Sequence, residues 1–291
     1  MHITIIMVVT YILCCARVAT GPWRYWQINA RYFSAEKGIF SKLSIDALIP
    51  ERWRLFQGAD TDTLQPAAFP VFLKPEWGQN AQGIHRADNA TQLTSLRHQL
   101  RNEPQNYLLQ EAAAGQREFE IFSIDTNHND GTHDVFTVTE AINRCEDFPI
   151  NSKYNSNTRY ADITDQFTAS EQSQLASYIS QIGQFGISRM SVRADSEIDL
   201  VAGNFHVIEI NLFLPMPINL LDDSYSWPKR LGFIYSSMSS LALATKMIQP
   251  VESPQPIFSR MMLYGRSKAA AVQSPPSRQE INDIGERQIP S

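Results

Sequence analysis

The chain has 291 residues, of which 43% are hydrophobic and 10% aromatic, and its formal net charge at pH 7 is −5. This length and apolar content allow one large core or two modest ones, and the negative charge argues against a nucleic-acid-binding surface. The three cysteines, Cys14, Cys15 and Cys145, are spaced neither as a disulfide framework nor as a zinc site. We therefore expect a reducing, cytoplasmic setting.

The chain begins with an apolar run, residues 3–16, which is closed by Arg17. The run is shorter than the roughly 20 residues that span a bilayer, and it lacks the basic start and the small-residue cleavage site of a secretory signal. Two interpretations stay open: an element buried against the main body, which is the commoner case, and a membrane contact through these residues. We treat 1–24 as an apolar N-terminal segment, followed by an aromatic- and arginine-rich lead-in over 25–65.

Apolar patterns then divide the main body of the chain into strands and helices. They predict strands at residues 69–74, 107–112, 118–125, 133–142, 187–194 and 204–213. They predict helices at residues 89–101, after residue 168 and at 230–248. Thr168 and Glu171 have the spacing of a capping box at the start of the second helix. From residue 251 the composition is rich in Pro, Ser, Gln and Arg and predicts a partly disordered tail.

One segment imitates a metal site. The sequence DTNHNDGTHD carries acidic residues and histidines close together, at Asp125, His128, Asp130, His133 and Asp134. Its spacing does not follow the calcium-loop pattern. The tripeptide at 129–131, Asn-Asp-Gly between two predicted strands, favours a hairpin turn.

A lysine at the end of a strand marks the first candidate site. Lys74 closes the apolar run FPVFLK, and a loop bracketed by Gly78 and Gly83 follows. Glycines let backbone N–H groups approach phosphate oxygens, and a lysine adds positive charge. The segment is not a P-loop, because the lysine precedes the loop and no G-K-[ST] follows. A phosphate site and an ordinary surface lysine beside a turn are the two interpretations.

Two further strands carry polar side chains on one face each. Glu209 and Asn211 lie two residues apart in HVIEIN, so both point to the same side. A carboxylate and an amide oxygen are ligands suited to Mg²⁺. Arg189 and Arg193 share a face of the strand ISRMSVRA and favour an anion or acidic side chains. Lys153 lies in a polar loop, NSKYNSN, able to fold over a site.

Taken in order, these motifs resemble the ATP-grasp superfamily, and most nearly its D-alanine–D-alanine ligase-like branch, over about residues 36–224. The motifs that carry the resemblance are PVFLKPEWGQNAQGI, YLLQEAAAGQREFEI, SKYNSN, SRMSVR, VIEIN and NLFLPMPINLLDDS, the last at the place of a substrate loop. The resemblance implies an α+β fold over 66–250, in which two α+β subdomains, about 66–125 and 126–250, clasp a nucleotide.

The resemblance also implies a role for each matching residue. ATP-binding roles fall on Lys42, for which Lys37 is an alternative, and on Lys74, Gly78, Gly83, Gln110, Glu111, Ala112, Ala113, Glu118 and Lys153. Lys74 would contact the α- and β-phosphates, Lys153 the γ-phosphate and Glu118 the ribose. Arg189 and Lys153 would be catalytic, and Glu209 and Asn211 would hold Mg²⁺.

The implied function is an ATP- and Mg²⁺-dependent ligase that joins a small-molecule carboxylate to an amine or thiol through an acylphosphate. Two departures bear on this expectation. Relatives carry an aspartate metal ligand where this chain has Ser191, and the nearest downstream carboxylates are Asp195 and Asp199. Only residues 1–65 precede the Lys74 strand, where the D-alanine ligases have a full α/β domain, so D-alanine is not expected in the same pose.

Two other functions stay open from the sequence. One is a catalytically weakened ATP-grasp protein that binds nucleotide only, and Ser191 is its main support. The other is a structural or membrane-associated protein without nucleotide binding. Measured nucleotide binding distinguishes the last from the first two, and ADP release distinguishes the ligase from the weakened protein.

Overall fold

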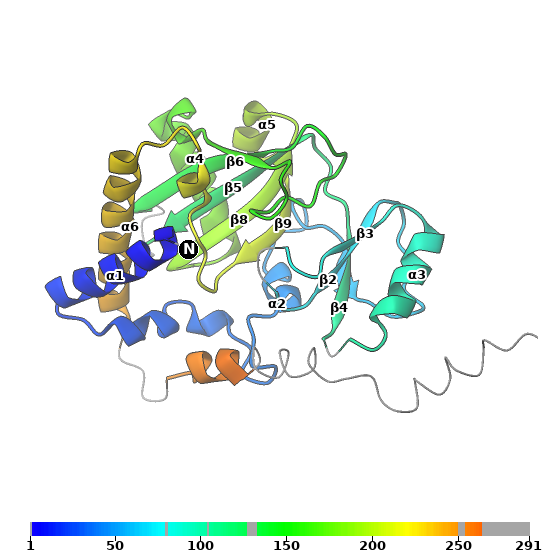
Figure 1. The fold of residues 1–291 in the computed structure, drawn as a ribbon, viewed down its shortest axis with the longest axis horizontal. Coiled ribbons are helices and arrows are strands. Elements are labelled where there is room, and N and C mark those ends of the chain that lie inside the picture. The colour runs from blue at the N-terminus through cyan, green and yellow to red at the C-terminus, as the bar shows by residue number, and fades with distance from the viewer. Residues whose placement is uncertain (1, 79–80, 104, 127–132, 250–253, 264–291) are drawn as a thin grey trace, which may run out of the picture.

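The computed structural model describes residues 2–78, 81–103, 105–126, 133–249 and 254–263. Two antiparallel sheets form its framework and lie side by side in Figure 1. Helices cover both sheets, so the expected α+β class is confirmed.

The smaller sheet consists of β1 (Gln57–Ala59), β2 (Val71–Pro75), β3 (His85–Ala87) and β4 (Tyr107–Glu111), in the order β1-β4-β2-β3. The helix α3 (Ala90–Leu100) covers it, because Leu93 packs against Leu73 of β2 and Leu109 of β4. The short helix α2 (Lys42–Asp46) begins after Ser41, whose hydroxyl accepts the N–H of Ser44.

The larger sheet consists of β5 (Arg117–Ile124), β6 (Val135–Ile142), β7 (Arg159–Asp162), β8 (Ile187–Ala194) and β9 (His206–Asn211), in the order β7-β6-β5-β8-β9. Its helices are α1 (His2–Arg17), α4 (Ala169–Ile182), α5 (Glu197–Ala202) and α6 (Trp227–Met247). Four 3-10 helices complete the chain, η1 (Pro22–Gln27), η2 (Ala30–Tyr32), η3 (Thr164–Gln166) and η4 (Ile218–Leu221).

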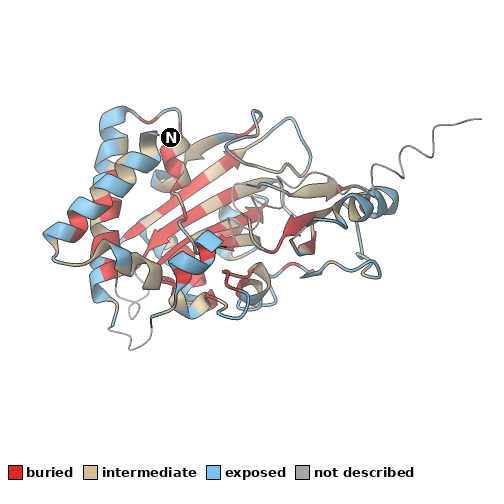
Figure 2. Cartoon of the chain, turned by 60° about the horizontal axis from the view of Figure 1, so that its bottom comes forward, coloured by how far each residue is buried: buried red, intermediate tan, exposed pale blue. Residues whose placement is uncertain are grey.

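The main core lies on one face of the larger sheet. Phe119 of β5 and Val192 of β8 are fully buried there together with Leu175 and Ile179 of α4. Figure 2 shows buried residues along these strands, whereas the exposed residues follow the outer sides of the helices. Strand alternation therefore gives this face to the core and leaves the opposite face for other partners.

The opposite face of the larger sheet is apolar at one end and polar at the other. Phe122 and Ile124 of β5 and Ile187 of β8 pack with residues of α1 and α6. Two residues further along the same strands, Glu120 and Arg189 line a pocket instead. The helices α1 and α6 thus cover only the apolar end of this face, and the polar end lines the pocket.

The predicted long strands and helices all have counterparts in the structure. The six predicted strands correspond to β2, β4, β5, β6, β8 and β9, and the three predicted helices to α3, α4 and α6. The capping box is confirmed, since the Thr168 side chain accepts the N–H of Glu171 and the Glu171 carboxylate accepts the N–H of Thr168. The strands β1, β3 and β7 were not predicted, because runs of three or four residues are too short to show a period.

The apolar N-terminal run forms α1, which packs on α6. Tyr11, Cys14 and Cys15 are buried, and the Tyr11 hydroxyl lies 2.9 Å from Oγ1 of Thr245. The outer side of α1 exposes Ile5, Val8, Val9, Ile12 and Leu13. Within the described ranges, every helix is too short or too polar to cross a membrane. The run is therefore a partly buried element, and its contact with a membrane surface stays a prediction.

The chain changes from the smaller sheet to the larger one at residues 112–116, between β4 and β5. The expected subdomain boundary near residue 125 lies after β5, which pairs with β6 and β8. An alternating apolar pattern shows that a strand exists but not which strand it pairs with. The sequence therefore did not reveal that β5 belongs to the larger sheet. The predicted turn at 129–131, with His128 and Asp130, lies outside the described residues. Of the tail expected from residue 251, the structure describes 254–263, where Ile257 and Met261 are buried in the main core.

We predict that Gly115→Ala destabilises the protein by more than about 1 kcal/mol. Gly115 has φ of +111°, and a Cβ there would lie 2.8 Å from the backbone nitrogen of Ala194 in β8. Gly232→Ala is the matched control, because a Cβ on Gly232 in α6 meets nothing within 4 Å. It should stabilise the helix by up to about 1 kcal/mol.

Urea unfolding of both variants and the wild type measures these differences. Equal stability of the Gly115→Ala variant and the wild type would contradict the close approach of residues 112–116 to β8.

Candidate functional site

A pocket lies between the two sheets and receives side chains from both. Of the expected site residues, all but Gly83 and Ala112 line it: Lys42, Lys74, Gly78, Gln110, Glu111, Ala113, Glu118, Lys153, Arg189, Glu209 and Asn211. Further lining residues come from β7, β8 and η4 and include Tyr160, Ser191, Arg193, Ile218 and Leu221. The structure thus brings residues that are far apart in sequence to one place.

Strand register explains how the larger sheet supplies its share. Glu120 of β5 lies directly opposite Ser191 of β8, and Ser191 lies directly opposite Glu209 of β9. Arg189 lies opposite Asn211 in the same way. Since side chains alternate along each strand, the residues of these rows share the pocket face.

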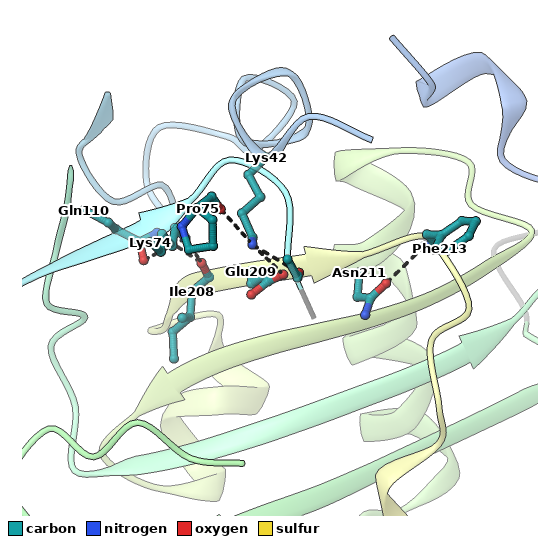
Figure 3. A network of polar contacts seen from close by, with 9 residues as sticks. Lys42, Lys74, Pro75, Gln110, Ile208, Glu209, Asn211 and Phe213 are labelled. Carbon is teal, nitrogen blue, oxygen red and sulfur yellow. Dashed lines mark hydrogen bonds and ion pairs between the residues drawn. The ribbon is translucent and has the colours of Figure 1, made fainter. Parts of the chain in front are cut away.

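Lys74 joins the two sheets at the floor of the pocket. Its buried ammonium group donates to Oε1 of Gln110 at 2.9 Å and to the carbonyl oxygen of Ile208 in β9 at 3.3 Å (Figure 3). The side chain of Gln110 donates to the same carbonyl at 3.0 Å. Burial lowers the pKa of Lys74 to about 7, opposed by Glu209 and assisted by Lys42. The contact holds β2 and β4 against β9 and places a cation beside Glu209.

Lys42 is the second lysine of the pocket. From the first turn of α2, its ammonium group lies 3.7 Å from Oε1 of Glu209 and donates to the carbonyl oxygens of Pro75 at 3.2 Å and Gly78 at 3.3 Å (Figure 3). The alternative lysine, Lys37, does not line the pocket and pairs with Glu76 at 2.5 Å. The structure therefore favours Lys42 over Lys37.

Glu209 and Asn211 present hard oxygen atoms to the pocket. Burial opposes ionisation of Glu209, but Lys42, Lys74 and Arg189 together hold its pKa below the usual value. The side-chain oxygen of Asn211 accepts the N–H of Phe213 at 3.0 Å and has a second lone pair left. An ionised carboxylate and an amide oxygen fit Mg²⁺. Across the described ranges, no three His, Cys, Asp or Glu side chains already form a metal cluster.

Glu118 and Lys153 lie at the edge of the pocket. Glu118 accepts a hydrogen bond from Asn151 at 3.0 Å, and burial, assisted by Glu120, raises its pKa to about 8. Lys153 is exposed, with its ammonium group 5.0 Å from the centre of the Tyr154 ring. The polar loop that carries Asn151 and Lys153 thus closes one side of the pocket.

Glu120 was not predicted as a site residue. Its Oε2 lies 3.1 Å from Nε of Arg189, and the arginine also donates to the carbonyl oxygen of Met216 at 3.3 Å. The signal was present in the sequence, because Glu118 and Glu120 are two residues apart on a predicted strand and must share a face.

The carboxylates that the sequence offered in place of an aspartate at position 191 are not at the site. Neither Asp195 nor Asp199 lines the pocket. β8 continues to Ala194, so Asp195 is exposed beyond the strand, and Asp199 accepts the hydroxyl of Ser196 at the start of α5. The idea that one of them replaces the missing ligand is therefore wrong.

No family model and no curated protein matches the sequence. Similar solved structures include D-alanine–D-alanine ligase from Bacillus anthracis complexed with ATP, at 16% identity and a TM-score of 0.45 over 71% of this chain and 66% of that chain. VanG D-Ala:D-Ser ligase from Enterococcus faecalis is 13% identical, with a TM-score of 0.49 over 72% of this chain and 61% of that chain. L-amino acid ligase from Bacillus licheniformis is 15% identical, with a TM-score of 0.39 over 59% of this chain and 40% of that chain.

All three of these structures are ligases by name. The chain covers less than two thirds of the length of each of these three structures.

We predict a pH dependence of stability that comes from Lys74. Its folded pKa is about 7 and its ordinary value is 10.5, so between these values the unfolded chain binds a proton that the folded chain lacks. The contribution of Lys74 to the free energy of unfolding therefore rises as the pH increases from about 7 to about 10.

Lys74→Met removes this rise while keeping an apolar side chain of similar length. Urea unfolding of both proteins measures the difference: the stability of the variant relative to the wild type should be greatest near pH 7 and should fall steadily as the pH rises toward 10.5. All other titrating groups are shared, so an identical pH dependence of the two proteins would contradict the lowered pKa.

Proposed function

We propose that this chain is an ATP- and Mg²⁺-dependent ligase of the ATP-grasp type, which joins a small-molecule carboxylate to an amine or thiol through an acylphosphate. The observation that carries the proposal is the convergence of Lys42, Lys74 and Arg189 with Glu209 and Asn211 in one pocket between two sheets. Three cations beside a carboxylate–amide pair match the charge of a triphosphate with its metal ion.

The nucleotide would lie across the boundary between the sheets. Lys74 and Lys42 would hold the α- and β-phosphates from the floor of the pocket, and Lys153 would approach the γ-phosphate from its edge. The backbone groups of Ala112 and Ala113, where the chain leaves β4, would bind the adenine. Glu118, Gln110 and Glu111 would complete the nucleoside side, with Glu118 at the ribose hydroxyls.

The loop between Gly78 and Gly83 would cover the phosphates. Both glycines lie in the described part of this loop, and Gly83 has φ of +75°, which a residue with a side chain rarely adopts. Closure of the loop would keep water from the acylphosphate, which hydrolyses easily.

The reaction requires mainly positioning and charge neutralisation. A carboxylate oxygen of the substrate attacks the γ-phosphorus of ATP and ADP leaves; the amine or thiol then attacks the acyl carbon and phosphate leaves. Both reactants of the first step are anions, so Lys153 and Arg189 would lower their repulsion and stabilise the transferred phosphoryl group. Bound Mg²⁺, held by Glu209 and Asn211, would supply further neutralisation of the phosphates.

The alternative is a weakened protein of the same fold that binds nucleotide without turning it over. Ser191 supports it, because a hydroxyl is a poorer Mg²⁺ ligand than a carboxylate. A screen of carboxylic acids with amines and thiols, read by ADP release, distinguishes the two. ADP release that depends on both an acid and a nucleophile supports the ligase, and nucleotide binding without turnover supports the alternative.

We predict that Lys74→Ala weakens ATP binding by at least about 100-fold, since it removes a charged hydrogen bond to phosphate worth about 3 kcal/mol. Lys37→Ala is the matched control, because Lys37 pairs with Glu76 outside the pocket and its loss should leave ATP affinity unchanged.

Calorimetric titration with ATP, with and without Mg²⁺, gives both affinities, and urea unfolding confirms that each variant is folded. Undiminished affinity in the Lys74→Ala variant would show that the phosphate assignment is wrong. A wild-type protein that binds no ATP would contradict the proposed function as a whole.

A further inference from the structure

The pocket contains a carboxylate to which the proposed function gives no role, that of Glu120. It stands in one row with Ser191 and Glu209 on three adjacent strands, β5, β8 and β9. Neighbouring strands lie about 4.8 Å apart, so the backbones of the two glutamates are separated by roughly 10 Å. Between them lies the small side chain of Ser191, and all three residues line the pocket.

The Glu120 carboxylate lies 3.1 Å from Nε of Arg189 on β8 and is close to Ser191 and Glu209. All four residues line the same pocket. The two carboxylates therefore belong to one pocket, in a row on either side of Ser191.

Each of the two carboxylates is held by a cation that the proposed function assigns to the nucleotide or the transferred phosphoryl group. Glu209 pairs with Lys42 at 3.7 Å, and Glu120 pairs with Arg189 at 3.1 Å. The second contact is an ion pair without hydrogen-bond geometry, because Oε2 of Glu120 and Nε of Arg189 are buried and neither makes a hydrogen bond. Both atoms thus retain the capacity to bind a better-placed partner.

We propose that Glu120 is a metal ligand of this site and supplies, from the neighbouring strand, the carboxylate that Ser191 lacks. The proposal rests on the proposed function, since phosphate groups would attract Lys42 and Arg189 and leave Glu120 and Glu209 for a divalent cation. Two carboxylates and the Asn211 amide oxygen form a donor set of the kind that Mg²⁺ prefers. Nucleotide and cation binding should then strengthen each other by the same factor.

The test is binding of Mn²⁺, a spectroscopically visible substitute for Mg²⁺, to the full chain. Free Mn²⁺ is followed by electron paramagnetic resonance in the presence of a non-hydrolysable ATP analogue, with protein in excess so that the analogue is bound. The nucleotide affinity of each variant without metal is measured separately by calorimetry. This second measurement distinguishes loss of a metal ligand from general damage to the pocket.

Glu120→Gln should weaken Mn²⁺ binding at least about 10-fold and leave metal-free nucleotide affinity within about 3-fold. Adding Ser191→Asp to this variant should restore Mn²⁺ affinity, because it returns a carboxylate to the same row. Glu140→Gln is the matched control: Glu140 also pairs with an arginine, its side chain is 15% exposed against 12% for Glu120, and it does not line the pocket. It should leave Mn²⁺ affinity unchanged.

Unchanged Mn²⁺ affinity in the Glu120→Gln variant, with nucleotide bound, would overturn the proposal and leave the proposed function intact. Failure of Ser191→Asp to restore affinity would also overturn it, since the loss would then reflect a disturbed Arg189. If the wild type binds no ATP analogue, the proposed function fails, and the metal proposal fails with it.

Discussion

The buried ammonium group of Lys74 is the interaction on which the pocket depends. A lysine out of contact with water is unfavourable unless polar groups and opposite charges surround it. Gln110, the Ile208 carbonyl and the nearby charge of Glu209 supply these partners. Gln110 lies in the smaller sheet, as Lys74 does, whereas Ile208 and Glu209 lie in the larger one. Satisfying one charge therefore fixes the smaller sheet against the larger one.

The same arrangement leaves the pocket prepared for an anion. Lys42, Lys74 and Arg189 face two glutamates, and the burial that lowers the pKa of Lys74 also strengthens any interaction with a phosphate. Cations that are already positioned need little reorganisation when a ligand arrives. The ion pairs of Lys42 with Glu209 and of Arg189 with Glu120 thus keep the charged groups of the pocket in place.

Much of the fold and part of the site could be predicted from the sequence, for reasons that particular residues make plain. Long strands and helices show their period, and the Thr168 capping box is a local interaction between near neighbours. The alternation rule placed Glu209 and Asn211 together, and Arg189 with Arg193, because it acts within one strand. Motif order also predicted Lys74, Lys153 and Glu118 as residues of one site, and all three line the pocket.

What could not be predicted depends on contacts between strands. The membership of β5 in the larger sheet, the pairing of Lys37 with Glu76 outside the pocket, and the place of Glu120 all follow from contacts with residues that lie far away in sequence. Asp195 and Asp199 looked like substitutes for a ligand at position 191 because they are close along the chain. In the sheet, the residues beside position 191 are set by strand register and not by distance along the chain.

Ser191 illustrates the difference between distance along the chain and strand register. Along β8 alone, a serine at this position gives the pocket no carboxylate. Across the sheet, the same serine lies between Glu120 and Glu209 on the neighbouring strands, and both of these glutamates line the pocket. A sheet places neighbours from different strands as close as neighbours two residues apart on one strand, so a charge missing from one strand can be supplied by the next. Whether the pocket binds a metal ion is therefore a property of the row of residues across β5, β8 and β9, and not of position 191 alone.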